Sequence, residues 1–310
     1  MPFRIVPDDT HISFMSQARL CAFLSAAAIV ASIVLFFAVG LNLGIDFKGG
    51  GLVEVRSISA APDLSDVRTK INSLGLGDVE ITSFGDESEL LIRFETQPGG
   101  PEAQSKAFRD IRAILGDGFE PRREEFVGPR IAGELALKGT IAVIVALIGV
   151  LFYIWFRFEW QFAVGAIGSL VHDVILTIGF FSLTQIDFNL SSLAAILTIV
   201  GYSLNDTVVV YDRMREMLRK FKQMAIPEMI DISINQMLSR TLLTSVTTLI
   251  ALISLFTFGG EIIRSFTAAM IWGVVIGTYS SIYIASPVLI YFNLRPGAVS
   301  APAATDPSKA

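Results

Sequence analysis

Six long apolar runs restrict what this chain can fold into more than any other feature of its sequence. They occupy residues 18–41, 133–156, 161–184, 189–211, 238–258 and 264–292. At 1.5 Å per residue, a helix of about 20 residues crosses the ~30 Å hydrocarbon layer of a bilayer. Because a bilayer holds no water to satisfy backbone polar groups, the sequence predicts a polytopic α-helical membrane protein with six transmembrane helices.

The composition supports this prediction and excludes several other classes of protein. Hydrophobic residues make up 52% of the chain and charged residues only 17%, whereas typical soluble domains are about 25% charged. The single cysteine, Cys21, lies in the first apolar run, so an intramolecular disulfide is excluded. The sequence has no basic cluster with interleaved aromatic residues, and we therefore expect no nucleic-acid partner.

The first apolar run has two interpretations, a cleaved signal peptide or a retained membrane anchor. Arg4 and Arg19 supply the basic flank that a signal peptide needs. The apolar core, however, is about twice as long as the usual 7 to 15 residues. We therefore expect the first helix to be retained.

Residues 42–132 read as a separate domain between the first two membrane helices. Strand-like and amphipathic helical segments alternate there, at residues 51–57, 64–74, 79–84, 90–94, 101–115 and 119–127. Their order, β-α-β-β-α-β, predicts a small α+β domain with the ferredoxin-like arrangement. Its 16 acidic and 11 basic residues indicate a solvated, mildly acidic surface.

The orientation in the membrane follows from the basic residues around the connection at residues 212–237. They are Arg213, Arg215, Arg219, Lys220, Lys222 and, at the start of the fifth run, Arg240. The two short connections on the opposite side carry only Arg264. By the positive-inside rule, this connection, the N-terminus (residues 1–17) and the C-terminal tail (residues 293–310) are cytoplasmic, and the α+β domain faces the other side.

The connection at residues 212–237 is also amphipathic. Met214, Met217, Leu218 and Phe221 recur at helical spacing, which predicts either a surface helix at the lipid headgroups or a docking site for a cytoplasmic partner. The tail that follows the last run is rich in proline, alanine and serine and is predicted to be disordered.

Asp206 places a carboxylate near the end of an otherwise apolar run. An aspartate at the centre of a membrane helix costs roughly 2.5 to 3.5 kcal/mol, whereas one leucine or phenylalanine returns only about 0.3 to 0.6 kcal/mol. Arg240, at the start of the next antiparallel helix, falls at a similar depth, so a pairing between the two is geometrically open. Ionisable residues in this setting are typical of ion or proton pathways, and we interpret the two as part of such a route; the alternative is a structural pair that holds helices together.

Other polar side chains lie near this pair along the third, fourth and fifth runs, which we expect to line one polar seam. The candidate supporting residues are Asn205, Ser203, Thr207, Thr244, His172 and Asp173. The alternative is that they only hold helices together. Close helix packing is also the interpretation of Gly273 and Gly277, which form a small-xxx-small step in the sixth run.

Patterns typical of enzymes and of metal sites are lacking in this sequence. It has no phosphate-binding loop and no nucleophile elbow. The chain has two histidines, His11 and His172, so few imidazole groups are available for acid–base catalysis. We expect no enzymatic activity, no cofactor and no metal.

Seven stretches, spread in order from the first run to the last, together carry a specific resemblance. They are NLGIDFKGG (42–50), VGPRIAGELALKG (127–139), YIWFRFEWQFAVGA (153–166), LVHDVILTIG (170–179), GYSLNDTVVVYDRMRE (201–216), NQMLSRTLLTS (235–245) and GTYSSI (277–282). The chain resembles the SecF proteins of the SecD/SecF family, protein-export membrane proteins related to the RND superfamily.

The resemblance implies a place in the bacterial inner membrane, where SecD supplies the second half of a twelve-helix bundle. Further implied partners are the SecYEG channel, the SecA ATPase with accessory Sec subunits, and the translocating polypeptide. The family is implied to use the proton-motive force, with H⁺ as coupling ion, to draw polypeptide across the membrane through motions of periplasmic domains. Asp206 and Arg240 match the family's proton-route residues.

Two other functions stay open at this point. The chain is alternatively a passive scaffold that stabilises SecD and the channel, its buried charges serving assembly. A further alternative is half of an RND-type small-molecule exporter. It is disfavoured because the α+β domain, with about 90 residues, is small for a substrate pocket.

Overall fold

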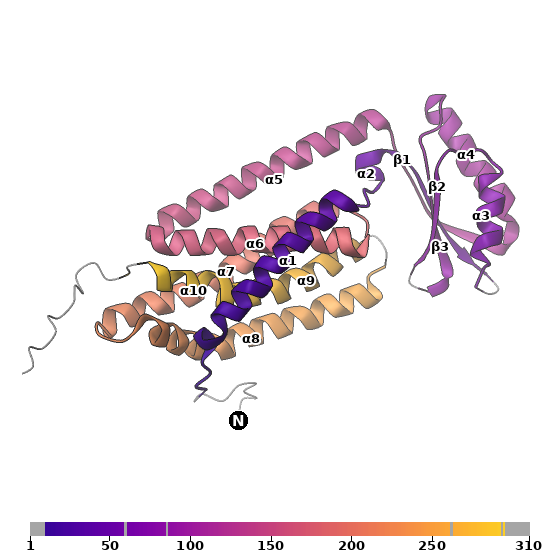
Figure 1. Ribbon diagram of the computed structural model, residues 1–310. Helices are drawn as coiled ribbons and strands as arrows, with labels where there is room; N and C mark the ends of the chain where they lie inside the picture. The colour runs from indigo at the N-terminus through magenta and orange to yellow at the C-terminus, as the bar shows by residue number, and fades with distance from the viewer. Residues whose placement is uncertain (1–9, 59–60, 85, 261–262, 293, 295–310) are drawn as a thin grey trace, which may run out of the picture.

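The computed structural model describes residues 10–58, 61–84, 86–260, 263–292 and 294 as a helical bundle with a small α+β domain beyond one end (Figure 1). Within these residues, six helices are long and apolar enough to cross a membrane. The predicted fold class, a polytopic helical membrane protein with a small α+β domain, is confirmed. Most of the predicted disordered tail and residues 1–9 lie outside the described residues.

The membrane helices are α1 (Ala18–Ala38), α5 (Pro129–Arg157), α6 (Trp160–Thr184), α7 (Leu190–Lys220), α8 (Ile226–Phe258) and α9 (Arg264–Ser280). Three of the six, α5, α7 and α8, extend several residues beyond the apolar runs that predict them. A 3-10 helix, η1 (Phe14–Gln17), precedes α1. After α9 the chain continues through a π-helix, η4 (Ser281–Ala285), α10 (Ser286–Val288) and η5 (Leu289–Tyr291).

The α+β domain has the predicted order of elements. After the short helix α2 (Ile45–Lys48) follow β1 (Gly50–Ser57), α3 (Leu64–Asn72), β2 (Val79–Phe84), β3 (Asp86–Phe94), α4 (Gly100–Leu115), a 3-10 turn η2 (Gly116–Gly118) and β4 (Phe119–Val127). The antiparallel sheet has the order β2-β3-β1-β4, so β3 lies between the two strands that α3 connects. This is the split β-α-β arrangement of ferredoxin-like domains. Helices α3 and α4 cover one face of the sheet (Figure 1).

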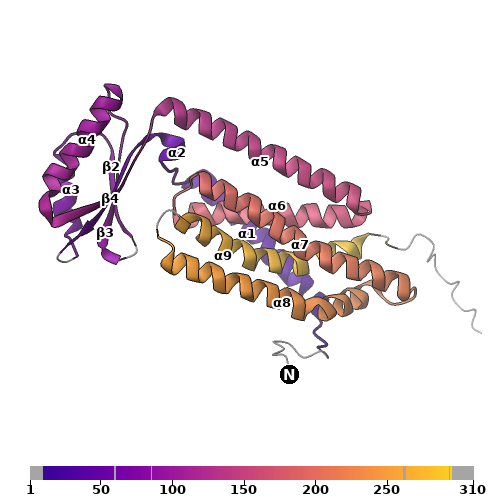
Figure 2. The same cartoon turned by 180° about the vertical axis from the view of Figure 1, so that it is seen from behind.

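Helices α6, α7 and α9 form the centre of the bundle. Half or more of the most apolar stretch of each is buried inside the molecule, whereas none of that stretch of α5 is. Figures 1 and 2 show α5 and α8 at opposite edges. Gly273 and Gly277 allow α9 to approach α7, because a Cβ atom at Gly277 would lie 3.0 Å from Ser203 Cβ. The predicted close packing at these glycines is confirmed.

The structure differs from the prediction at residues 212–237. Helix α7 continues to Lys220 and α8 begins at Ile226, with Pro227 in its first turn, so most of this segment extends the two membrane helices. Met214 and Met217 are buried in the core cluster that also contains Met229 and Ile230. The prediction of a surface helix at the headgroups is therefore wrong: helical spacing shows that an apolar face exists, and the neighbouring α8 covers it instead of lipid.

Candidate functional site

The carboxylate of Asp173, in the middle of α6, connects three helices. Its side chain is 0% exposed. Oδ2 accepts hydrogen bonds from Ser203 Oγ of α7 at 2.5 Å and from Ser280 Oγ of α9 at 2.8 Å. Oδ1 lies 2.9 Å from Nδ1 of His172. A buried carboxylate with three partners is well satisfied, which is what a stable structural group inside lipid requires.

A second hydroxyl extends this network on α6. Ser169 Oγ donates to Ser280 Oγ at 2.8 Å. Ser280 Oγ is also within 3.2 Å of the carbonyl oxygen of Gly277, but its single proton serves one acceptor at a time. Because Ser169 donates to it, Ser280 donates its own hydrogen bond to Asp173, and the hydrogen bonds run in one direction from Ser169 to the carboxylate.

Asp206 lies one helical turn beyond Ser203 on α7, in a different environment. Its side chain is 4% exposed, and Oδ2 has no hydrogen-bond partner among the described residues. Arg240 acts on this carboxylate through its charge. Within the described part of the chain, however, the two side chains form no ion pair within 4.0 Å. Arg240 is exposed, so the predicted pairing is an electrostatic relationship and not a direct contact.

The candidate supporting residues do not surround Asp206. Ser203 donates to Asp173, and Thr207 Oγ1 lies 2.8 Å from Ser281 Oγ of the π-helix. Asn205 is exposed. Thr244 Oγ1 donates to the carbonyl oxygen of Arg240 at 2.9 Å, within its own helix. The prediction that Ser203 and Thr207 support Asp206 does not fit these contacts, because their hydroxyl groups bind side chains of other helices.

The polar seam also differs in the helices that form it. Sequence reasoning expected the third, fourth and fifth membrane helices, but Asp173 and Thr207 also have buried hydroxyl partners on α9 and on the π-helix after it. Ser280 and Ser281 were missed. The only signal in the sequence was a pair of serines one turn after Gly277. Helix α8 contacts α9 and α7 through Ser245, whose Oγ lies 2.8 Å from Thr278 Oγ1 and 3.4 Å from the Tyr202 hydroxyl.

These geometries give the two carboxylates different chemistry. Asp173 has its oxygens occupied by donors, whereas Asp206 has one buried oxygen available to bind a proton. A charge without a local partner in a low-dielectric site is destabilised, and a nearby cation such as Arg240 offsets that cost. No group of three or more His, Cys, Asp or Glu residues suited to a metal ion occurs among the described residues.

A second feature of the site is the junction between the α+β domain and the bundle. Arg93 of β3 forms an ion pair with Asp187, in the connection between α6 and α7. Asp46 of α2 accepts a hydrogen bond from the backbone N–H of Leu190 at 3.0 Å, and Asn42 Nδ2 donates to Asp187 at 3.2 Å. The domain is therefore attached to the first turn of the helix that carries Asp206.

Comparison with known proteins identifies the family. Residues 108–295 match the family described as protein export membrane protein SecD/SecF, C-terminal, and residues 34–57 match the SecD/SecF GG motif. The chain belongs to the SecD/SecF family. The GG motif of this family covers the end of α1, α2 and β1, which include the segment that attaches the domain to α7.

Relatives in the SecD/SecF family match nearly the whole chain. The protein translocase subunit SecF of Rickettsia rickettsii (strain Sheila Smith) is 44% identical over 304 residues, covering 95% of this chain and 96% of its own length. The protein translocase subunit SecDF of Brucella abortus is 41% identical over 303 residues, covering 98% of this chain but 40% of its own. The chain thus spans almost all of a SecF protein and less than half of a SecDF protein.

Solved structures of SecDF have the same fold. The crystal structure of SecDF, a translocon-associated membrane protein from Thermus thermophilus, matches with a TM-score of 0.83 and 33% identity, over 93% of this chain and 39% of that one. A SecDF structure described as a super-membrane-facing form matches with a TM-score of 0.67 over 94% of this chain.

Proposed function

We propose that this chain is the SecF subunit of a Sec protein-export machinery. With SecD, it uses the proton-motive force to assist late stages of polypeptide translocation across the bacterial inner membrane. The family membership and the 44% identity to SecF over 95% of the chain support this function. The structural observation that carries the proton-driven part is the buried, unpartnered Oδ2 of Asp206.

The proposal includes partners and an orientation. SecD is the second half of the bundle, a role supported by the SecDF relatives, in which this chain corresponds to only about 40% of one longer polypeptide. SecYEG, SecA and the exported polypeptide are the further partners. Both termini lie in the cytoplasm and the α+β domain in the periplasm, a proposal supported by the basic residues from Arg213 to Lys222 and by Arg240.

The proposed cycle starts at Asp206. Moving one proton charge through ~100 mV yields about 2.3 kcal/mol. Protonation of Asp206 removes its attraction for Arg240, and α8 shifts relative to α7. The change reaches the α+β domain through the Asp46 and Arg93 contacts at the start of α7, and through the direct passage from β4 into α5.

Export in proteoliposomes that contain the chain with SecD, SecYEG and SecA tests this function. Asp206→Asn is expected to abolish the gain in export that an imposed proton gradient produces, while the complex with SecD still assembles. Thr198→Ala, a change at an exposed residue of the same helix whose hydroxyl donates to the carbonyl oxygen of Ala194, is the matched control and keeps that gain. An Asp206→Asn complex with unchanged proton-driven export contradicts the proposal. Loss of assembly together with activity favours the passive scaffold.

A further inference from the structure

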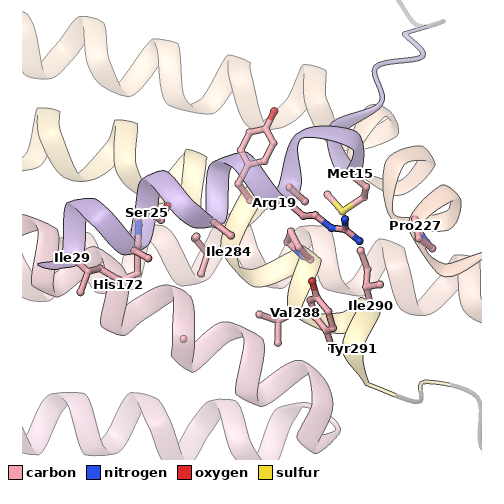
Figure 3. A pocket seen from close by; sticks show the side chains of 16 residues that line it. Met15, Arg19, Ser25, Ile29, His172, Pro227, Ile284, Val288, Ile290 and Tyr291 are labelled. Atoms are coloured by element: carbon pink, nitrogen blue, oxygen red, sulfur yellow. The ribbon is translucent and has the colours of Figure 1, made fainter.

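A groove between α1 and the rest of the bundle is not used by the proposed proton pathway. Its volume is about 470 Å³, within the range of roughly 300 to 1,000 Å³ typical of ligand pockets. Figure 3 shows α1 on one side and α6 with the chain after α9 on the other. Most of its lining is apolar and includes Ala22, Ala26, Ile29, Ile284, Val288 and Ile290.

A cation stands at one end of this groove. Arg19, in the first turn of α1, directs its guanidinium group into the opening beside Ile290 and Tyr291 (Figure 3). The side chain is exposed, and the structure gives it no ion pair or hydrogen bond with the described residues. Tyr291 is 79% exposed at the same level. Arginine and tyrosine side by side at the end of a membrane helix are typical of the lipid headgroup region.

The inner end of the groove is polar as well. His172 lines it and is 2% exposed, and its Nδ1 is occupied by Asp173. Its Nε2 has no partner among the described residues. Ser25 of α1 lies beside the histidine (Figure 3), and its Oγ is 2.8 Å from the hydroxyl of Tyr279. Six residues separate Ser25 from Arg19, about 9 Å along the helix.

We propose that this groove binds one anionic glycerophospholipid. Its phosphate contacts Arg19, its glycerol ester region lies beside His172 and Ser25, and one acyl chain lies against Ala26 and Ile29. The order of a cation at the membrane surface, a polar atom farther in and an apolar wall matches the order of groups along such a lipid. The low burial of α1, 11% of its most apolar stretch, fits a helix held against the bundle partly through lipid.

Native mass spectrometry of the purified full chain tests the site. The probes are dioleoyl phosphatidylglycerol and dioleoyl phosphatidylcholine, which have the same acyl chains and differ in headgroup charge. The wild type is expected to retain one phosphatidylglycerol and to prefer it to phosphatidylcholine. Arg19→Gln is expected to weaken this retention roughly fivefold or more, the effect of one basic residue at a membrane surface. Arg219→Gln, at an exposed cation outside the groove, is the matched control.

A second pair of variants tests the apolar wall without removing charge. Ala26→Phe fills the groove and is expected to reduce retention of phosphatidylglycerol. Ala27→Phe, at the next and also exposed residue, which does not line the groove, leaves it unchanged. Equal retention of both lipids, equal retention by Arg19→Gln and wild type, or an equal loss in Ala27→Phe overturns the proposal.

Photo-crosslinking in membranes separates a lipid from a protein occupant. A benzophenone side chain introduced at Ala22 is expected to yield a phospholipid adduct. An adduct with a protein at this position would show that a polypeptide covers the groove, and would overturn the assignment.

Discussion

Ser203 Oγ donates a 2.5 Å hydrogen bond to Asp173 Oδ2, although Asp206 follows three residues later on the same helix. This bond uses a hydroxyl one helical turn before Asp206 for another carboxylate, and Asp206 Oδ2 is buried without a described partner. One acidic residue of the seam therefore holds helices together, while the other is available to bind a proton. This division is the basis of the proposed cycle.

Removal of the Ser203 hydroxyl tests the structural role of Asp173. Ser203→Ala leaves a buried carboxylate with one donor fewer, and we expect a loss of roughly 0.6 to 2 kcal/mol in the free energy of unfolding. Thermal unfolding in detergent micelles measures it. Ser254→Ala is the control, since Ser254 is exposed on α8 and donates only to the carbonyl oxygen of Ile250. Equal stability of the two variants would show that the bond to Asp173 contributes nothing.

A conservative substitution at Arg240 tests how this residue acts on Asp206. Because the two side chains form no ion pair within 4.0 Å in the described structure, the positive charge matters more than the shape of the guanidinium group. Arg240→Lys is therefore expected to keep most proton-driven export in the reconstituted complex with SecD, and Arg240→Gln to lose it. If lysine is as inactive as glutamine, Arg240 works through a direct contact formed in another state.

The Arg93–Asp187 ion pair is expected to hold the α+β domain against the bundle. Its side chains are 11% and 20% exposed. Arg93→Gln should weaken docking by about 1 to 2 kcal/mol, a value reduced for partial exposure. Faster hydrogen exchange at residues 42–48 would report this weakening.

Two further variants make this test specific to the junction. The exchanged pair Arg93→Asp with Asp187→Arg should recover part of the protection. Arg112→Gln breaks a more exposed ion pair with Glu124 inside the domain and should leave residues 42–48 unchanged. Identical exchange in all variants would show that the apolar contacts of the junction hold the domain on their own.

Substitution of Gly277 by alanine tests the close approach of α7 and α9. A methyl group there lies 3.0 Å from Ser203 Cβ, so Gly277→Ala forces apart the helices that the Asp173 network joins. We expect a loss of about 1 to 3 kcal/mol in the free energy of unfolding. Gly201→Ala on α7 meets no atom within 4 Å and is expected to be neutral or slightly stabilising. Thermal unfolding of the two variants measures the difference, and similar values would place the close contact elsewhere.

The sequence alone determined the architecture of this protein. Six apolar runs of sufficient length have few alternatives to membrane helices, because lipid leaves backbone groups without water. In residues 42–132, alternating and helical periodicities determined the order of strands and helices, and this order selected the sheet topology. The high cost of a charge in lipid was enough to select the ionisable residues of the apolar runs, Asp206 and Asp173 among them.

Only the tertiary structure decided which polar groups meet. Ser203 and Asp206 share a face of α7, but the rotation of that helix against α6 and α9 directs Ser203 to Asp173, and brings in Ser280, which sequence reasoning missed. Met214 and Met217 have the spacing of a lipid-facing surface, yet α8 buries them. The physical reason is the same in each case: periodicity along one helix tells which residues share a face, whereas the partner of that face depends on packing between segments far apart in the chain.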